Sequence, residues 1–517
     1  MTLPIINCDL LLLGSGMIST PLIDFLVYNK EIKYNINIAS LDKNFLILLK
    51  NKYSNLKTTY IDIIKEKDEL LKLIEGNSFV ISLLPQSLQA EILKYCMIKE
   101  KSLLTTSEIT EEISNTYKKY VNSLKKNNSI DKLFYVFECG CNPGLDHIIS
   151  AKVIKEAIRK GSNIIEYENW SGAMPAPENT DNPILYKFSF SPLESLKGMV
   201  SNTSQLINNK IINIKEKELL NYLVGSESFH PSYNFEGYFV KNNTDNIKNY
   251  YSLLNSRTII TGSVRYKGFS FIIQAFKYLG LFSDNKINTN LSKNKKEISW
   301  RTFLSNKILN KFREKEYYTF QLTYINNKFK PEYFNINISS KLERYFYFRL
   351  TCIALSYFDY AFINKYNFTN LFNRLYPALY YFNFYNTENL LKVDKPVVAS
   401  FFMLLENKIK MQEWERDMVY MKNKYTIKTF SGKIILKTFE LILYGRTNDL
   451  EYTATSFLVG NTAGVITNCI LLGKYNNLSN KEVISIPYDE LIADEVLKNL
   501  AKKKVYLYEK SQLNVKF

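Results

Sequence analysis

Short apolar segments alternate with helical segments along residues 1–137, and this alternation restricts the possible fold more than any other feature of the chain. The apolar segments that predict strands lie at residues 9–13, 34–39, 59–61, 79–84, 103–106 and 134–137. The helical patterns between them lie at residues 18–28, 67–75 and 86–97. Strands that alternate with helices at this spacing form an open, doubly wound parallel sheet. The sequence therefore predicts an α/β domain of the Rossmann type.

A glycine turn follows the first predicted strand directly. Gly14 permits a sharp turn, and Gly16 lets the backbone approach a pyrophosphate at the N-terminus of the next helix. Ser19 stands where the third glycine of the dinucleotide fingerprint usually lies. A turn that only ends the strand is the alternative. The position of this glycine turn after a buried strand favours a dinucleotide site.

The end of the second predicted strand bears on the choice of cofactor. NAD enzymes place a carboxylate there to hold the ribose hydroxyls, whereas this chain has Ser40. Lys43 could pair with a 2′-phosphate, and Asp42 would oppose it. We predict NADP, with NAD as the alternative.

Composition narrows the function classes. The chain has 517 residues, 46% of them hydrophobic, which is enough for two or three domains. Its net charge of +17 is spread over the chain, so we favour a solvated basic surface over a nucleic-acid site. The six scattered cysteines and the lack of a targeting segment or an uninterrupted apolar run predict a cytoplasmic protein without a membrane partner. Two histidines argue against a metal centre or a histidine-driven triad.

Two loops rich in proline and glycine lie at residues 138–147 and 170–178. Pro-Gly in the first and Pro-Ala-Pro in the second restrict the backbone, so Asn142, Ser171 and their neighbours are held on stiff loops. Beside a nucleotide-binding fold, such loops build a pocket for a small molecule.

With the glycine turn, these loops resemble the glutamate-forming saccharopine dehydrogenases, also called saccharopine reductases. The lengthiest matches are residues 175–191 and 262–269. The resemblance implies a Rossmann domain at residues 1–147 that is completed by residues 453–470. It implies an α+β substrate domain made of residues 148–282, 413–452 and 471–517, with a diverged and largely helical insertion at residues 283–412.

Members of this family reduce the imine formed between glutamate and aminoadipate semialdehyde, or oxidise saccharopine in the reverse direction. The resemblance therefore implies an NADP-dependent oxidoreductase of lysine metabolism that acts on a CH–NH group. Its partners would be these small-molecule substrates, without nucleic acid, and a homodimer is the assembly we consider.

The resemblance also implies roles for individual residues. Arg265 is the predicted carboxylate clamp, because its fork suits a bidentate pair, and a strand arginine facing solvent is the alternative. The predicted cofactor-binding residues are Gly14, Ser15, Gly16, Met17, Ile18, Ser40, Leu41, Asp62, Leu84, Pro85, Thr106, Ser107, Cys141, Asn142, Pro143 and Ser191. The predicted substrate-binding residues are Ser107, Asn142, Lys241, Val264 and Arg265. The predicted catalytic residues are Asn142, Ser171, Glu108 and Lys187, and a solvated lysine is the alternative for the last.

Several of these positions depart from the family pattern. Glu108 replaces a tyrosine, Asn142 an aspartate and Ser171 a cysteine, while Lys241 and Thr261 each replace an arginine. The loss of ionisable and bidentate groups would weaken catalysis or change the substrate. Two alternatives therefore stay open: a related enzyme acting on another amino-acid-derived substrate, and a nucleotide-binding protein without catalysis.

Overall fold

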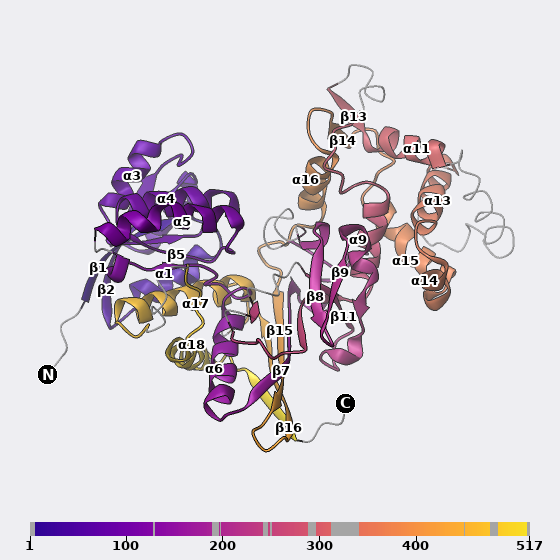
Figure 1. Ribbon diagram of the computed structural model, residues 1–517. Helices are drawn as coiled ribbons and strands as arrows, with labels where there is room; N and C mark the ends of the chain where they lie inside the picture. Colours follow the sequence, from indigo (N-terminus) through magenta and orange to yellow (C-terminus); the bar gives the residue numbers. More distant parts are fainter. Residues whose placement is uncertain are drawn as a thin grey trace. The chain divides into compact units, whose positions relative to one another are not determined.

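The computed structural model divides the chain into two compact units (Figure 1). The described residues are 6–127, 130–188, 196, 198–240, 247–248, 251–287, 296–311, 341–448, 450–475 and 484–513. The first unit comprises Met1–Ser171, Thr244–Ile259 and Arg416–Phe517, and the second comprises Gly172–Asn243 and Ile260–Glu415. The domain limits predicted from the sequence describe functional domains and not compact units, so they stay a prediction.

A parallel sheet of six strands forms the nucleotide-binding part of the first unit, in the order β3-β2-β1-β4-β5-β6. Its strands are β1 (Ile6–Leu13), β2 (Ile32–Ser40), β3 (Lys57–Tyr60), β4 (Phe79–Ser82), β5 (Ser102–Thr105) and β6 (Tyr135–Val136). All pairings between them are parallel. Leu10, Leu11, Leu12 and Leu13 have no exposed surface, as expected for a strand covered on both faces. The predicted doubly wound sheet is confirmed. Strands β2 and β3 lie on one side of β1, and β4, β5 and β6 lie on the other.

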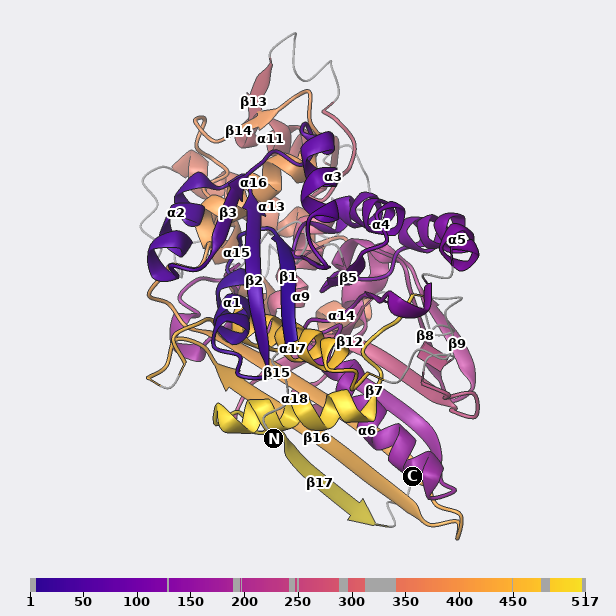
Figure 2. The same cartoon turned by 90° about the vertical axis from the view of Figure 1, so that its left-hand side faces the viewer.

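Helices connect these strands, as Figure 2 shows. They are α1 (Ser19–Val27), α2 (Lys43–Lys52), α3 (Lys67–Glu75), α4 (Gln89–Ile98) and α5 (Glu111–Lys126). Helix α3 has the predicted bounds, whereas the predicted helix at residues 86–97 begins as a 3₁₀ turn over Gln86–Leu88. Helices α2 and α5 were not predicted, although each begins at a side-chain cap. Asp42 accepts a hydrogen bond from the Phe45 amide, and Thr110 accepts one from the Ile113 amide.

Helix α17 (Ala454–Leu471) packs against α1 through small residues. A Cβ atom added to Gly460 would lie 2.8 Å from the carbonyl oxygen of Ile18 and 2.9 Å from the amide nitrogen of Leu22. A Cβ atom added to Gly464 would lie 2.5 Å from the ring of Phe25. Among the described helices, α17 alone is long and apolar enough to cross a membrane, and 83% of its 18-residue window is buried in the protein. It is therefore a core helix that fixes the position of α1.

The remainder of the first unit combines helices α6 (Leu145–Arg159) and α18 (Glu490–Lys502) with long antiparallel strands. Strand β16 (Ile434–Tyr444) pairs with both β15 (Asp417–Lys428) and β17 (Tyr508–Leu513). Strand β7 (Asn163–Pro175) is next to β15 in the sheet order. Strands β7 and β12 (Thr258–Tyr266) each run through both units.

The second unit contains further β-strands and a helical region. The further strands of the sheet are β8 (Thr203–Ile207), β9 (Lys210–Ile214), β10 (Leu223–Val224) and β11 (Phe235–Phe239). Strand β11 pairs antiparallel with β10 and β12, and helix α9 (Phe269–Tyr278) follows β12.

The predicted insertion at residues 283–412 is largely helical in its described part, as expected. Its helices are α11 (Trp300–Lys311), α13 (Lys341–Leu355), α14 (Tyr360–Tyr366), α15 (Phe368–Tyr381) and α16 (Val397–Ile409). Its strands β13 (Glu297–Ser299) and β14 (Leu390–Lys392) pair antiparallel.

The contact between α17 and α1 can be tested with Gly460→Ala. Replacing a glycine by an alanine inside a helix normally stabilises the helix by about 1 kcal/mol. Here we expect the free energy of unfolding to fall by about 1–3 kcal/mol, because the new methyl group meets the backbone of α1. Denaturant unfolding measures the change. Gly198→Ala is the control, since a Cβ atom there meets nothing within 4 Å. Equal stability of the two variants would contradict the tight contact.

Candidate functional site

The turn after β1 depends on two glycines with different roles. Gly14 has a φ of +100°, which side-chain-bearing residues rarely adopt, and its amide donates to the carbonyl oxygen of Ala39 over 3.0 Å. Gly16 has open space around the position of a Cβ atom, with nothing within 4 Å. Its carbonyl oxygen accepts hydrogen bonds from both the amide and the hydroxyl of Ser19, at 2.9 and 2.6 Å. Ser19 therefore fastens the turn to α1, which explains why a serine suits the third position.

The N-terminus of α1 is open to a ligand. Ile18 occupies the N-cap position without a side-chain cap, and the first turn of the helix has no acidic residue. Met17, next to it, is 48% exposed. A positive helix end beside a bare glycine suits the pyrophosphate of a dinucleotide.

The end of β2 carries no acid, and it borders a pocket of about 620 Å³. The pocket is lined by Leu41, Asp42, Lys43, Asn44 and Tyr60. The Lys43 ammonium lies 4.3 Å from the centre of the Tyr60 ring, so its charge is held at the pocket.

Two serines and one carboxylate complete this region. The Ser40 hydroxyl is hydrogen-bonded to that of Ser15 and accepts a bond from the Asp42 amide at 3.1 Å. The Asp42 carboxylate caps α2 through the Phe45 amide. Asp42 therefore has a structural role as the cap of α2, in addition to its expected opposition to Lys43.

The other predicted cofactor residues lie where strands of the parallel sheet end. Asp62 follows β3 and forms an ion pair with Lys65 at 3.0 Å, and the hydrogen bond from Lys65 lowers the pKa of Asp62. After β4, the carbonyl oxygen of Leu84 accepts from Gln89 at 2.8 Å, and Pro85 begins the next turn. The structure therefore gives these three residues fixed positions along one edge of the sheet.

The segment after β5 contains Thr106, Ser107 and Glu108. The carbonyl oxygen of Ser107 accepts from the Glu138 amide at 3.1 Å. The backbone amide and carbonyl of Glu108 both bond to the Gln86 side chain at 3.0 Å. The carboxylate of Glu108 is therefore presented from a backbone that is held on both sides.

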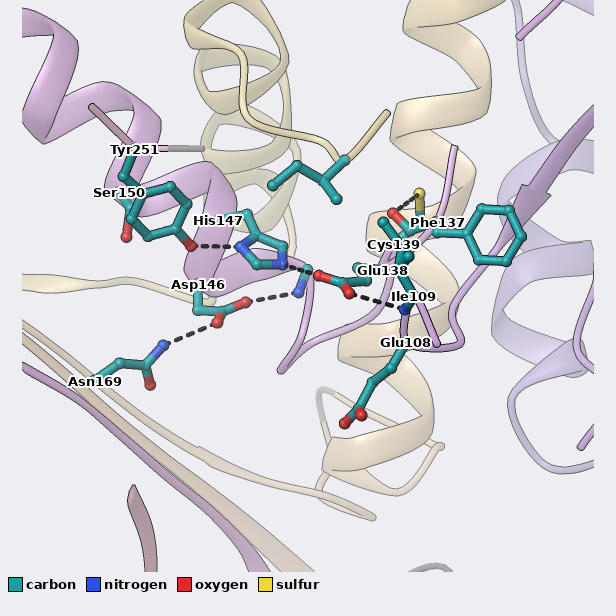
Figure 3. A network of polar contacts seen from close by, with 12 residues as sticks. Glu108, Ile109, Phe137, Glu138, Cys139, Asp146, His147, Ser150, Asn169 and Tyr251 are labelled. Carbon is teal, nitrogen blue, oxygen red and sulfur yellow. Dashed lines mark hydrogen bonds and ion pairs between the residues drawn. The ribbon is translucent and has the colours of Figure 1, made fainter. Parts of the chain in front are cut away.

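A buried polar network joins this segment to the loop at residues 138–144 and to α6 (Figure 3). One carboxylate oxygen of Glu138 accepts from the Ile109 amide at 3.0 Å. The other lies 2.7 Å from Nε2 of His147, and Nδ1 of His147 is hydrogen-bonded to the Tyr251 hydroxyl. Glu138 adopts a φ of +60°, an uncommon conformation for a residue with a side chain.

A second branch of the network holds Asn142. The Asp146 carboxylate accepts from the Gly144 amide at 2.6 Å and from Nδ2 of Asn169 at 2.8 Å. Nδ2 of Asn142 donates to Oδ1 of Asn169 at 3.0 Å. Pro143 contributes its carbonyl oxygen, which accepts from the Gly140 amide at 3.0 Å. Asn142 is therefore oriented by Asp146 through Asn169.

Two further features restrict this loop. Gly144 has a φ of +143°, and a Cβ atom there would lie 2.1 Å from the carbonyl oxygen of Gly140. Cys141 is buried, and burial raises the pKa of its thiol to about 12, so it stays protonated at neutral pH. The loop can therefore supply amide groups, but not a thiolate.

Sequence reasoning missed Glu138, His147, Asn169 and Tyr251 as parts of the site. The Asp146-His147 pair was visible after Pro-Gly, and it was the available signal. Asn169 lies on β7, and Tyr251 lies on a separate segment 104 residues beyond His147. Their convergence depends on the tertiary fold.

In the second unit, Arg265 is a buried cation on β12. It is 7% exposed, which excludes the solvent-facing alternative. Its guanidinium carbon lies 5.1 Å from the ring centre of Tyr186, 5.8 Å from that of Phe269 and 5.9 Å from that of Tyr238. Nη1 donates to the Ser263 hydroxyl and to the carbonyl oxygen of Val264, while Nε has no hydrogen-bond partner.

Lys187, in contrast, already has two carboxylate partners. It pairs with Asp181 at 2.8 Å and with the buried Glu415. Burial lowers the pKa of Lys187, but the hydrogen bonds and charges of these two carboxylates outweigh it and leave the pKa raised. Lys187 is therefore a charged member of an ion-pair cluster, and not the solvated lysine of the alternative.

The remaining predicted site residues give less information. Ser171 is half-buried on β7, and Val264 is buried on β12. Ser191 and Lys241 lie outside the described residues. Within the described residues, no group of three or more histidines, cysteines or acids is placed to hold a metal ion.

Comparison with known families agrees with this arrangement. Residues 140–505 match the saccharopine dehydrogenase C-terminal domain, and residues 10–132 match the saccharopine dehydrogenase NADP binding domain. The chain belongs to the saccharopine dehydrogenase family. Its first domain is accordingly an NADP-binding domain.

Members of the saccharopine dehydrogenase family match over most of the chain. The saccharopine dehydrogenase [NADP(+), L-glutamate-forming] of Schizosaccharomyces pombe is 25% identical over 505 residues, which are 97% of this chain and 98% of that protein. The mitochondrial alpha-aminoadipic semialdehyde synthase of Rattus norvegicus is 26% identical over 466 residues, 90% of this chain. The match spans only 44% of the length of that protein.

The fold is that of a solved saccharopine dehydrogenase. The apo enzyme (L-Glu forming) from Saccharomyces cerevisiae superposes with a TM-score of 0.75 at 22% identity. The alignment covers 98% of this chain and 100% of the yeast chain. This likeness concerns the architecture, and the assignment of chemistry depends on the residues described above.

The residues of the first domain fit NADP. The bare Gly16 and the uncapped α1 suit the pyrophosphate, while Ser40 in place of an acid and Lys43 at the pocket suit a 2′-phosphate.

We expect Ser40→Asp to raise the Kd for NADPH relative to that for NADH by tenfold or more, about 1.4 kcal/mol. A carboxylate there would repel the 2′-phosphate and accept the ribose hydroxyls. Fluorescence titration with each cofactor measures both constants. Asn51→Asp is the control, because it adds the same charge to an exposed position of α2. An unchanged ratio in Ser40→Asp would show that Ser40 does not face the ribose.

Proposed function

We propose that this protein is an NADP-dependent, L-glutamate-forming saccharopine dehydrogenase of lysine metabolism. The observation that carries this proposal is Arg265, a buried guanidinium that no carboxylate pairs with in the described part of the chain. Such a cation requires an anion from elsewhere, and the substrates of this reaction carry several carboxylates.

The surroundings of Arg265 suit a bound carboxylate. Burying an unpaired charge is costly, and the faces of three aromatic rings offset only part of that cost. Nη1 is held by Ser263 and Val264, so the orientation of the guanidinium is fixed before a ligand arrives. The unpartnered Nε leaves a donor for the ligand. A guanidinium that is oriented in advance in this way suits a carboxylate ligand.

The first unit supplies groups for the transfer itself. The bound nicotinamide would supply or accept the hydride. Asn142 is oriented by Asn169 and can hold a polar substrate atom, but it cannot ionise. Glu108 carries an exposed carboxylate on a held backbone, so we assign proton transfer to Glu108 or to a water molecule. Lys187 serves this role poorly, because its pKa is raised by two carboxylates.

The cysteines support a reducing compartment. All six are free and buried. We propose a cytoplasmic enzyme on this basis. The mammalian relatives carry the word mitochondrial in their names, so localisation experiments should include that organelle. A homodimer is the proposed assembly.

Saccharopine oxidation tests the function directly. The purified protein is given saccharopine with NADP⁺ or NAD⁺, and the absorbance of the reduced nicotinamide is followed. Turnover that favours NADP⁺ supports the proposal. NADPH binding without turnover would favour the alternative of a nucleotide-binding protein without catalysis, for which Asn142 in place of an acid is the specific observation.

Arg265→Lys separates the clamp from a structural role. Lysine keeps the charge but loses the fork, so we expect the KM for saccharopine to rise about tenfold or more. The Kd for NADPH should change by less than about twofold. Arg301→Lys is the matched control, since Arg301 also lies over a tyrosine ring, at 3.9 Å, but on α11. Equal changes for substrate and cofactor would show that Arg265 is structural.

A further inference from the structure

The His147 ring lies between the Glu138 carboxylate and the Tyr251 hydroxyl inside the first unit, and the Asp146 carboxylate is its neighbour in sequence (Figure 3). The side chains of His147 and Glu138 are 10% and 17% exposed, and Asp146 is 5% exposed. In the described part of the chain, no lysine or arginine pairs with Glu138 or Asp146. An imidazolium at His147 is therefore the cation available to balance the buried charge of Asp146 and the partly buried charge of Glu138.

The hydrogen bonds of the ring suit its protonated form. Burial lowers the pKa of His147, but the charge of Asp146 and the hydrogen bond and charge of Glu138 outweigh it, so the pKa is raised. Burial also raises the pKa of Tyr251 far above its usual value, so Tyr251 stays a neutral hydroxyl that can accept from Nδ1. Both ring nitrogens then donate, one to Glu138 and one to Tyr251.

The other groups around this network are neutral or point elsewhere. Tyr167 on β7 lies edge-on to Tyr251, and Tyr488 stacks on Tyr251. Ser150 on α6 bonds to Tyr167 and to Tyr425 on β15. The ammonium of Lys155 lies over the Tyr488 ring and donates to the Tyr488 carbonyl oxygen. None of these described groups gives Glu138 a second cation.

The same network reaches the groups that the proposed reaction uses. Glu138 accepts from the amide of Ile109, which directly follows Glu108. Asp146, next to His147, holds Asn169 and so Asn142. The charge on His147 therefore acts on the two places where a substrate atom or a proton would be handled.

We propose that His147 is a positioning residue: in its protonated form it holds the Glu138 carboxylate, and Glu138 in turn holds the backbone that presents Glu108 and borders the Asn142 loop. The effect on turnover rests on the proposed function, whereas the effect on the fold does not. Loss of the proton removes the balancing charge from the buried Asp146 and the partly buried Glu138, and it loosens this segment.

The direction of the pH effect follows from the raised pKa. A group whose pKa is higher in the folded protein stabilises the fold fully below its unfolded value, about 6.5 for histidine. That contribution is lost as the pH rises through the higher, folded value. Both thermal stability and kcat should therefore fall as the pH rises through the titration of His147.

Histidine NMR provides the direct test, because the chain has only two histidines, His147 and His230. The ring signals of the full chain are followed against pH, and His230→Gln assigns them. We expect the His147 midpoint to lie above 6.5. Glu138→Gln, which keeps the shape of the side chain but removes its charge, should lower the midpoint by about one pH unit or more. A midpoint below 6.5, or one that Glu138→Gln leaves in place, would overturn the proposal.

Kinetics and unfolding test the positioning role with His147→Gln, a neutral side chain that can still donate to Glu138. We expect kcat about tenfold lower, without the decline of wild type over the titration of His147, and a Kd for NADPH within about twofold of wild type. His230→Gln should keep the wild-type profile. An unaltered pH profile of kcat in His147→Gln would refute the role in turnover.

A failure of the proposed function gives a different pattern. If no form of the protein oxidises saccharopine, the proposed function fails, but the NMR midpoint and the pH dependence of thermal unfolding still test the charge on His147. Wild type should lose more stability than His147→Gln as the pH rises, and parallel curves would reject the proposal. If His147→Gln does not fold, Tyr251→Phe replaces it, since it removes only the partner of Nδ1 and should lower the His147 midpoint; an unchanged midpoint would count against the proposal.

Discussion

The candidate site of the first unit depends on the hydrogen bonds of the Glu138 carboxylate. This carboxylate joins three segments that the chain brings together from separate places: Ile109 after β5, the loop after β6, and His147 on α6. The strained φ of Glu138 persists because hydrogen bonds fix both its amide and its side chain. Without this carboxylate, the ends of β5 and β6 would keep the backbone hydrogen bond between Glu138 and Ser107, but they would lose the side-chain link to His147 on α6.

The two units prepare their ligand groups by different physical means. The nucleotide turn leaves space for a ligand, since Gly16 has no Cβ atom and α1 has no side-chain cap. Around Arg265, in contrast, side chains hold the ligand group in place. Three aromatic rings and two oxygen acceptors orient the guanidinium, and its Nε remains without a partner. An opening lined by backbone accepts a phosphate whatever group that phosphate carries. A guanidinium held in one orientation instead selects anions by their geometry.

Local patterns in the sequence were sufficient for the sheet and the cofactor turn. Strand β1 and helix α3 follow from unbroken apolar runs and helical spacing, and Gly14 needs no distant partner to be understood. Helices α2 and α5 were missed although Asp42 and Thr110 were visible caps, because their faces are rich in lysine and only narrowly apolar. Lys187 could not be interpreted from its surroundings in sequence, since its partner Glu415 lies 228 residues away. Long-range pairing decides the charge environment of a side chain, and a single sequence does not contain it.

The packing of α17 on α1 has a consequence for how the chain is made. Asn29 and Asn468 are hydrogen-bonded although 439 positions separate them. On the ribosome, β1 and α1 emerge long before α17, so the side of α1 that packs on α17 stays uncovered until residues 454–471 have been synthesised. Contacts so distant in sequence form slowly, and the uncovered surface invites aggregation in the interval. The nucleotide-binding part is therefore completed only after residues 454–471 have been synthesised, later than a contiguous domain would be.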